Sequence, residues 1–212
     1  MLRSHAVASL LLALAACDVA TVRKLDPVTG KAIIEEEHQA FDARTFVATN
    51  WASRVLPEVQ KRAVPLPVLM RALASDRAAA VAKYGNGGTG GRASFLVTGT
   101  ARVLAVDTTS RSGTARLDLE PYDGTPDAEL QLGPVFRGTA LRDALPFIHF
   151  DDFTNQMEYA SVSRVLHRRI ADSVLAKMDR AALAGSVIHF SGAFAEGTGL
   201  PLVTPVTLQV GR

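Results

Sequence analysis

The sequence predicts an α+β protein: an OB-like β-barrel with strand order β-β-β-α-β-β, preceded by a helical hairpin. Three observations carry this prediction. Helical periodicity fills residues 41–84, strand patterns dominate from residue 93 onward, and one long amphipathic helix interrupts those strands. This order of elements is typical of the oligonucleotide/oligosaccharide-binding barrel. A β-sandwich with packed helices is the alternative, because strand order alone does not show that a barrel closes.

Residues 1–16 have the features of a bacterial lipoprotein export signal. Arg3 precedes an apolar run that ends at Ala16, and small residues stand directly before Cys17, the only cysteine of the chain. We expect cleavage before Cys17 and acylation of its thiol, which would anchor the protein to a membrane. The run is shorter than the roughly 20 residues that a permanent span requires. An ordinary secretory signal with an incidental cysteine is the alternative.

The residues after Cys17 indicate where the protein resides. Asp18 follows the predicted acylation site. In lipoproteins of two-membrane bacteria that are similar to this one, an acidic residue there commonly keeps the protein on the inner membrane. We therefore expect a lipid-anchored protein on the periplasmic face of the cell membrane, with residues 17–40 as a tether.

The composition is that of a folded protein rather than a disordered one. Hydrophobic residues make up 48% of the chain and charged residues 21%. The formal net charge is only +2, which gives no electrostatic footprint for nucleic acid. We expect no nucleic-acid partner.

Residues 41–84 are predicted to form the helical hairpin. Apolar residues recur at intervals of three and four between residues 41 and 63, and Asp42 is placed to cap the start of this helix. Pro65 breaks the pattern before a second helix over residues 66–84.

A glycine-rich stretch, residues 85–92, matches G-x-G-x-x-G letter for letter. A dinucleotide-binding fingerprint must follow a strand and open a helix, whereas this stretch follows a helix and precedes a strand. We interpret it as a flexible linker and expect no nucleotide cofactor.

The OB-like domain is predicted to span residues 93–212. Its long helix covers residues 155–184, where Asn155 and Glu158 resemble a capping box and Gly185 stands at the end. Gly99 is expected to bend the first strand. The predicted strands and extended segments are 94–107, 114–120, 129–132, 147–150, 186–194 and 203–210.

The segment after the third strand carries a recognisable motif. It reads Gly-Pro-Val-x-Arg-Gly-Thr-Ala-Leu-Arg-Asp from Gly133, followed by Phe-Ile-x-Phe-x-Asp-Phe-x-Asn-Gln-x-Glu from Phe147. This pattern resembles a family of predicted periplasmic bacterial lipoproteins, catalogued as domain of unknown function 2291. The resemblance implies an OB-like fold and genes that often accompany those of sugar ABC transporters. It implies no catalytic residue.

The same segment supplies the candidate binding surface. The guanidinium groups of Arg137 and Arg142 suit a carboxylate, a phosphate or sugar hydroxyls, and Asp143 can accept from hydroxyls. In the alternative interpretation, Arg137 pairs with Asp143 or Asp152 and fixes a loop, while Asn155 caps the helix rather than binding a ligand. The candidate surface comprises Arg137, Thr139, Arg142, Asp143, Asn155 and Gln156.

Metal binding and catalysis find little support in the sequence. His149 and Asp151 would share a face if their segment were extended, but no H-x-x-x-H or H-E-x-x-H pair occurs. No nucleophile motif stands out either. We expect no metal, no cofactor and no catalytic residue.

These observations lead to two functional hypotheses. The first is a non-enzymatic, membrane-tethered accessory of solute uptake, with a sugar as the expected solute, that contacts an ABC transporter permease or a solute-binding protein. The second is an independent module that binds a small molecule or oligosaccharide.

Overall fold

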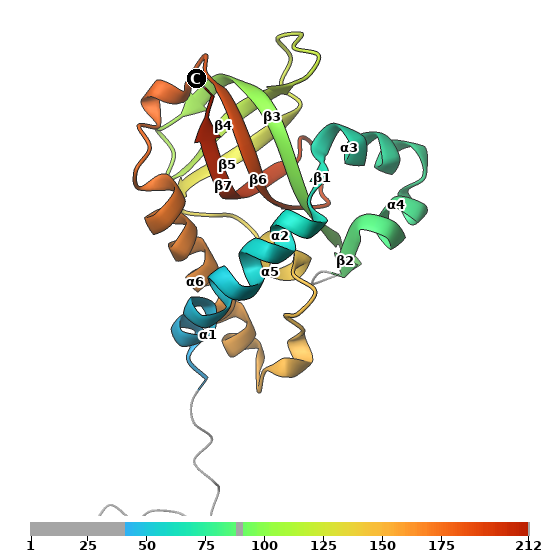
Figure 1. The fold of residues 1–212 in the computed structure, drawn as a ribbon, viewed down its shortest axis with the longest axis vertical. Coiled ribbons are helices and arrows are strands. Elements are labelled where there is room, and N and C mark those ends of the chain that lie inside the picture. The colour runs from blue at the N-terminus through green and yellow to red at the C-terminus, as the bar shows by residue number, and fades with distance from the viewer. Residues whose placement is uncertain (1–40, 88–90, 212) are drawn as a thin grey trace, which may run out of the picture. The chain divides into compact units, whose positions relative to one another are not determined.

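The structure is a computed structural model that describes residues 41–87 and 91–211. The predicted signal and tether, with Cys17 and Asp18, lie outside the described residues. The central element is a barrel of five strands, closed because β6 pairs with both β7 and β3 (Figure 1). The strands are β3 (Ala93–Asp107), β4 (Ser112–Leu119), β5 (Ala128–Pro134), β6 (Val187–Ala195) and β7 (Leu202–Val210).

The strand order around the barrel is β3-β4-β5-β7-β6. Neighbours are antiparallel except β5 and β7, which run parallel. Closure confirms the predicted OB-like barrel and removes the β-sandwich alternative.

β3 is long enough to pair with two strands, β6 along its first part and β4 along its second part. Residues 94–102 pair with β6, and residues 101–107 pair with β4. The pairing of β3 with β4 shifts register between Val103 and Ala105. The irregularity of β3 therefore lies there and not at Gly99, where the bend was predicted. Gly99 instead leaves room for a buried ring, since a Cβ there would stand 2.8 Å from Cζ of Phe190.

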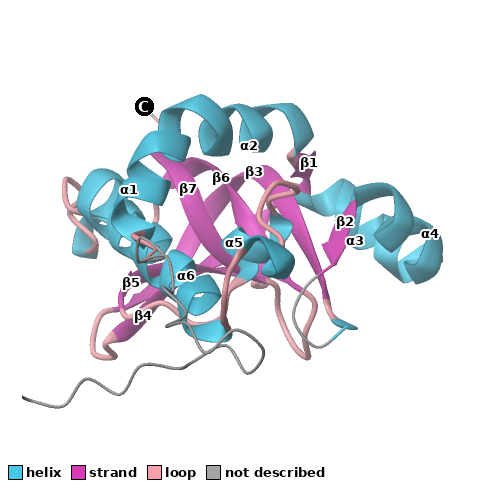
Figure 2. Ribbon diagram, turned by 90° about the horizontal axis from the view of Figure 1, so that it is seen from below, coloured by secondary structure: helices cyan, strands magenta, loops and turns pink. Residues whose placement is uncertain are grey.

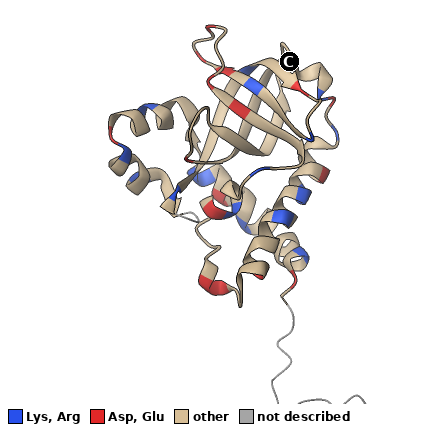
Figure 3. Cartoon of the chain, turned by 180° about the vertical axis from the view of Figure 1, so that it is seen from behind, with Lys and Arg blue, Asp and Glu red and all other residues tan. Residues whose placement is uncertain are grey.

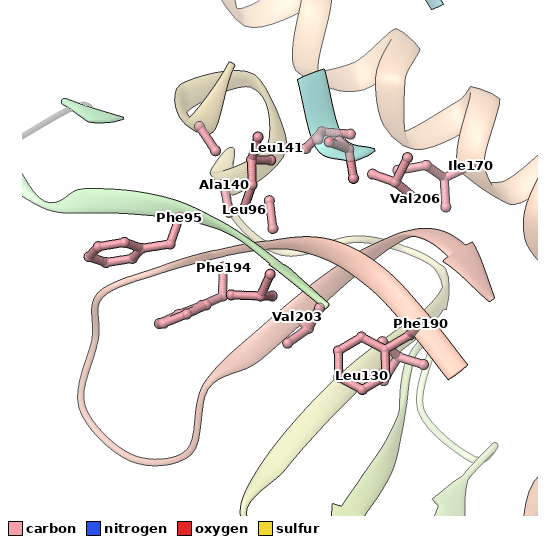
Figure 4. Close-up of a cluster of buried hydrophobic side chains, with 14 of the residues drawn as sticks. Phe95, Leu96, Leu130, Ala140, Leu141, Ile170, Phe190, Phe194, Val203 and Val206 are labelled. Atoms are coloured by element: carbon pink, nitrogen blue, oxygen red, sulfur yellow. The ribbon is translucent and has the colours of Figure 1, made fainter. Parts of the chain in front are cut away.

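The barrel interior is filled by apolar side chains from every strand. Phe190, Leu130 and Val203 lie inside, and Phe95 stacks on Phe194 at one end (Figure 4). Leu141 and Ile170, from two of the helices, close the end of the barrel near Val206. The core is therefore continuous from the barrel into the helices.

The first predicted helix is one continuous helix with a wider turn inside it. It comprises α1 (Ala43–Asn50), a π-helical turn (Trp51–Val55) and α2 (Leu56–Arg62). Asp42 caps it as predicted, accepting from the backbone N–H groups of Arg44 and Thr45 at 3.0 and 3.1 Å. Figure 2 shows this helix beside the barrel, where α1 packs on α6 and α2 on β3 and β6.

The second predicted helix, residues 66–84, is two helices. Asp76 interrupts it because its carboxylate accepts from the backbone N–H of Ala79 and starts a new helix. The helices that pair are therefore α3 (Leu66–Ser75) and α4 (Arg77–Tyr84), and the predicted pairing of residues 41–63 with 66–84 is wrong. Arg77 fixes this arm to the barrel through both carboxylate oxygens of Glu196.

The glycine-rich stretch predicted as a linker is partly a strand. β2 (Gly85–Gly87) pairs antiparallel with the start of β3, and β1 (Val64–Pro65) pairs parallel with Val97 and Thr98. β4 does not reach this part of β3, so its backbone groups would otherwise form an open edge. Residues 88–90 lie outside the described residues.

Two further predictions about the α6 region need correction. α6 (Gln156–Ile170) continues through a π-helical turn to Leu175, nine residues short of the end predicted at residue 184. Asp179 provides a local alternative to the helix, because its carboxylate accepts from the backbone N–H groups of Ala181 and Ala182. The predicted extended segment 147–150 leads into a 3-10 turn, Phe150–Asp152. Among the described residues no helix is long and apolar enough to cross a membrane.

Candidate functional site

A cleft of about 790 Å³ lies where β2, α5 (Ala140–Ala144), the Phe150–Asp152 turn and α6 meet. Figure 2 looks at the molecule from below and shows α5 between α6 and β2. Both polar and apolar side chains line the cleft, as is usual in small-molecule sites. The lining residues are Asn86, Gly87, Thr139, Arg142, Ile148, His149, Phe150, Asp151, Gln156, Tyr159 and Ala160.

A buried ion pair forms one wall of the cleft. Nε and Nη2 of Arg142 lie 2.8 and 2.6 Å from Oδ1 of Asp143, and both side chains are almost fully buried. The guanidinium carbon stands 3.6 Å from the ring centroid of Tyr159, and Nη1 donates to that residue's carbonyl oxygen at 3.3 Å. The charge of Arg142 is thus balanced by a carboxylate and its plane is fixed by an aromatic ring.

Asp143 is held by further hydrogen bonds. The Thr139 hydroxyl donates to Oδ2 at 2.6 Å, and the Tyr159 hydroxyl donates to Oδ1 at 3.2 Å. The amide of Asn86 donates to the backbone carbonyl of Asp143 at 2.7 Å. Burial raises the pKa of Tyr159, and the nearby charge of Asp143 raises it further, so this hydroxyl stays protonated. These bonds join β2, α5 and α6 into one polar network.

An aromatic cluster adjoins the polar network through Tyr159. The ring of Phe150 is 50% exposed and meets Tyr159 edge-on, with 5.4 Å between centroids and 87° between planes. Phe153 packs on the same Tyr159, and Phe41 packs edge-on against Phe153 at 5.0 Å. The rings therefore run from the start of the described chain to the mouth of the cleft.

The arrangement suits a ligand that has both hydroxyl groups and an apolar face. Thr139, Gln156 and Asn86 supply hydrogen-bonding groups, and Phe150 supplies an exposed ring. The Arg142 charge is already paired with Asp143. The cleft therefore presents hydrogen-bonding groups to a ligand, without an excess of positive charge.

The family model described as a predicted periplasmic lipoprotein, DUF2291, matches residues 7–209. The chain belongs to the DUF2291 family. Membership identifies the protein as a predicted periplasmic lipoprotein, which implies attachment to a membrane through lipid. None of the curated proteins matches this sequence.

The fold of the DUF2291 protein is similar to that of an OB-fold protein from Thermotoga maritima, known from its crystal structure. The TM-score is 0.64 with 14% sequence identity, over 82% of this chain and 100% of the other. At this identity the likeness concerns the fold, and the OB-like barrel predicted from the sequence is confirmed.

The residues predicted as a binding surface in the DUF2291 protein are only partly brought together. Thr139, Arg142 and Gln156 line the cleft, and Asp143 lies behind Arg142. Asn155 caps α6, accepting from the backbone N–H groups of Met157 and Glu158 at 2.9 and 3.0 Å. The cap interpretation is thus confirmed, although Glu158 accepts from Thr154 rather than from Asn155, so the predicted capping box is displaced by one residue.

Arg137 does not take part in the cleft. Its guanidinium lies 3.8 Å from Glu129, and its backbone N–H donates to the side chain of Gln131. The predicted pairing of Arg137 with Asp143 or Asp152 is wrong, because Asp143 is occupied by its own neighbour, Arg142.

Several cleft residues escaped the sequence analysis. Asn86 lay in the presumed linker and Tyr159 follows the end of the motif, whereas Phe150 belongs to the motif but was not chosen as a binding residue. His149 and Asp151 do line the cleft, although their segment is not extended. In the described part of the chain no group of three or more His, Cys, Asp or Glu side chains could hold a metal ion.

Proposed function

We propose that this DUF2291 protein is a non-enzymatic, lipid-anchored binding protein that serves solute uptake and holds a small neutral solute in the cleft. A sugar is the solute that we favour. A sugar ring presents hydroxyl groups at its edge and C–H groups on its face, which match the polar and aromatic walls of the cleft. The observation that carries the proposal is that the half-exposed Phe150 lines the same cleft as Thr139 and Gln156.

The charge of the cleft supports a neutral solute over an anionic one. Arg142 is neutralised by Asp143, and the carboxylate of Asp151 also lines the cleft. A carboxylate or phosphate ligand would have to compete with Asp143 for a buried guanidinium, at the cost of leaving a buried charge unpaired. A hydroxyl group can share the existing network without breaking the pair.

Thermal unfolding in the presence of a panel of neutral sugars, sugar acids and sugar phosphates tests the ligand. A ligand at one hundred times its Kd stabilises the folded state by about 2.7 kcal/mol, which is roughly 5 to 10 °C for a domain of this size. We expect at least one neutral sugar to raise the Tm, and Phe150→Ala to abolish the shift.

Met157→Ala is the matched control. Met157 is 69% exposed and follows the Phe150 turn, but it does not line the cleft. This variant should keep the full ligand-induced shift. Stabilisation by anions alone, or an equal loss in both variants, would argue against the proposal.

The link to uptake rests on the family resemblance and on the membrane anchor. We propose that the protein contacts an ABC transporter permease or a solute-binding protein while held to the membrane through Cys17, with Asp18 retaining it on the inner membrane. A Cys17→Ala strain should accumulate unlipidated precursor and lose uptake of the bound sugar.

Co-purification of the lipidated protein tests the partner. Recovery of a permease or a solute-binding protein would support the accessory role. Lipidated protein that binds sugar but is recovered alone, in a strain with unchanged uptake, would favour the independent binding module.

A further inference from the structure

A second hollow, of about 420 Å³, lies between α6 and the loop that follows β5. Val135 and Phe136 form its loop side, and Val135 is 40% exposed. Arg164 and Arg168 form its helix side. The hollow shares no lining residue with the cleft described above.

The two arginines project from one face of the helix. They are four residues apart, so their side chains lie one turn from each other, about 6 Å along the axis. Both are exposed, and within the residues that the structure describes neither forms an ion pair or a side-chain hydrogen bond. Figure 3 shows Lys and Arg positions, coloured blue, recurring along α6. Asp172, at the far end of the hollow, is its only carboxylate.

A stacked pair of rings also lines the hollow. His167 stacks on Phe136, with ring centroids 5.0 Å apart and planes 19° from parallel. Burial lowers the pKa of His167 to about 4, so the imidazole is neutral at physiological pH and adds no charge. Arg180 fixes the loop by donating to the carbonyl oxygen of Gly133 at 3.2 Å. An exposed apolar side chain, Val135, therefore lines the same hollow as two cations whose positions are set by a helix.

We propose that this surface, formed by Arg164, Arg168, Val135 and Phe136, docks the domain on the anionic phospholipids of the membrane that anchors the protein. Guanidinium groups bind phosphate through paired hydrogen bonds, and an exposed apolar side chain beside them can enter the interfacial layer. As a lipoprotein the chain has a membrane surface as its permanent neighbour. Weak contacts then suffice, because the lipid anchor raises the local concentration of that surface.

Vesicle sedimentation of the mature chain, residues 17–212 with Cys17→Ser, separates this surface from the lipid anchor. We expect binding to vesicles with 30% phosphatidylglycerol at low salt, loss of binding on pure phosphatidylcholine, and weakening at high salt. Each basic residue near an anionic surface contributes roughly a fivefold change in partitioning. The double variant Arg164→Glu, Arg168→Glu should therefore bind at least tenfold more weakly.

The matched control is Arg71→Glu with Lys83→Glu, on the α3–α4 arm. It changes the net charge by the same amount on two other helices, and both residues are exposed. We expect it to retain most of the binding. Arg164→Gln with Arg168→Gln should fall between the wild type and the charge reversal, and unchanged circular dichroism spectra would show that the variants are folded.

Three results would overturn the proposal. They are no binding of the wild type to anionic vesicles at low salt, equal binding to neutral vesicles, and an equal loss in the two charge-reversed variants. The last result would mean that net charge, rather than this surface, governs the interaction.

Discussion

The guanidinium of Arg142 lies over the ring of Tyr159, and both side chains donate hydrogen bonds to the same oxygen of Asp143. These residues come from α5 and α6, which are joined by the turn that carries Phe150. The contact therefore fixes the position of both helices on either side of the cleft. Stability and ligand binding should depend on it together.

Replacing Arg142 by methionine should be strongly destabilising. The substitution leaves the Asp143 carboxylate buried without its cation, and breaking a buried pair in this way typically costs about 3 to 5 kcal/mol. Urea unfolding followed by the fluorescence of Trp51 measures the loss. Arg137→Met is the control, because the Arg137 guanidinium is half exposed and 3.8 Å from Glu129, so its loss should change stability by less than about 1 kcal/mol.

Asn155→Ala should remove about 1 kcal/mol from the free energy of unfolding, since the first backbone N–H groups of α6 lose their acceptor. The next residue, Gln156, offers a comparison on the same turn. Gln156→Ala should be nearly neutral for stability, because Gln156 is exposed and is not the cap. If the two variants unfold at the same urea concentration, the cap contributes nothing.

Gly192→Ala should destabilise the barrel by about 1 to 3 kcal/mol. A Cβ at Gly192 would overlap the backbone carbonyl of Thr204 on β7, where the pairing of β6 with β7 shifts register. Gly197→Ala is the control variant, because no heavy atom of a neighbouring residue would lie within 4 Å of the new Cβ. Thermal unfolding of the two variants side by side distinguishes the clash from a general effect of removing glycine.

His167 should make stability depend on pH. Its folded-state pKa of about 4 is below the ordinary value of 6.5, because burial and, to a lesser extent, the charge of Arg142 disfavour the imidazolium. Between these pH values the unfolded state binds more protons than the folded state, so stability is complete above pH 6.5 and falls as the pH drops toward 4. The full loss is at most about 3 kcal/mol.

The variant His167→Phe keeps an aromatic ring against Phe136 but has no proton to gain. Its unfolding free energy should decline less than that of the wild type between pH 6.5 and 4. Parallel curves for the two proteins would mean that other groups account for the acid sensitivity.

Helix caps and strands could be predicted from the sequence where residues close together in the chain determine them. Asp42 and Asn155 were recognisable as caps because the capping residue and the backbone N–H groups that donate to it are neighbours in sequence. The same holds for the strand patterns, whose order identified the barrel. Asp76 caps a helix by the same local rule, three residues before Ala79, but the continuous apolar pattern over residues 66–84 predicted a single helix.

The cleft depended on contacts that sequence spacing does not reveal. Asn86 reaches Asp143 across 57 positions, and it belonged to a stretch whose glycines suggested a linker. That stretch became a strand because β4 leaves part of the β3 edge unpaired, which is a property of the assembled barrel. Arg137 and Arg142 belong to the same sequence motif, but only Arg142 lines the cleft.

The aromatic contact between Phe41 and Phe153 has a mechanical consequence. Force that is transmitted along the backbone to Phe41 acts on a ring that packs edge-on against Phe153. Phe153 contacts Tyr159, which packs on Arg142 and lines the cleft. The barrel strands, in contrast, are held together by their own closed set of strand pairings. Force on Phe41 would therefore act on the residues beside which the ligand is proposed to bind.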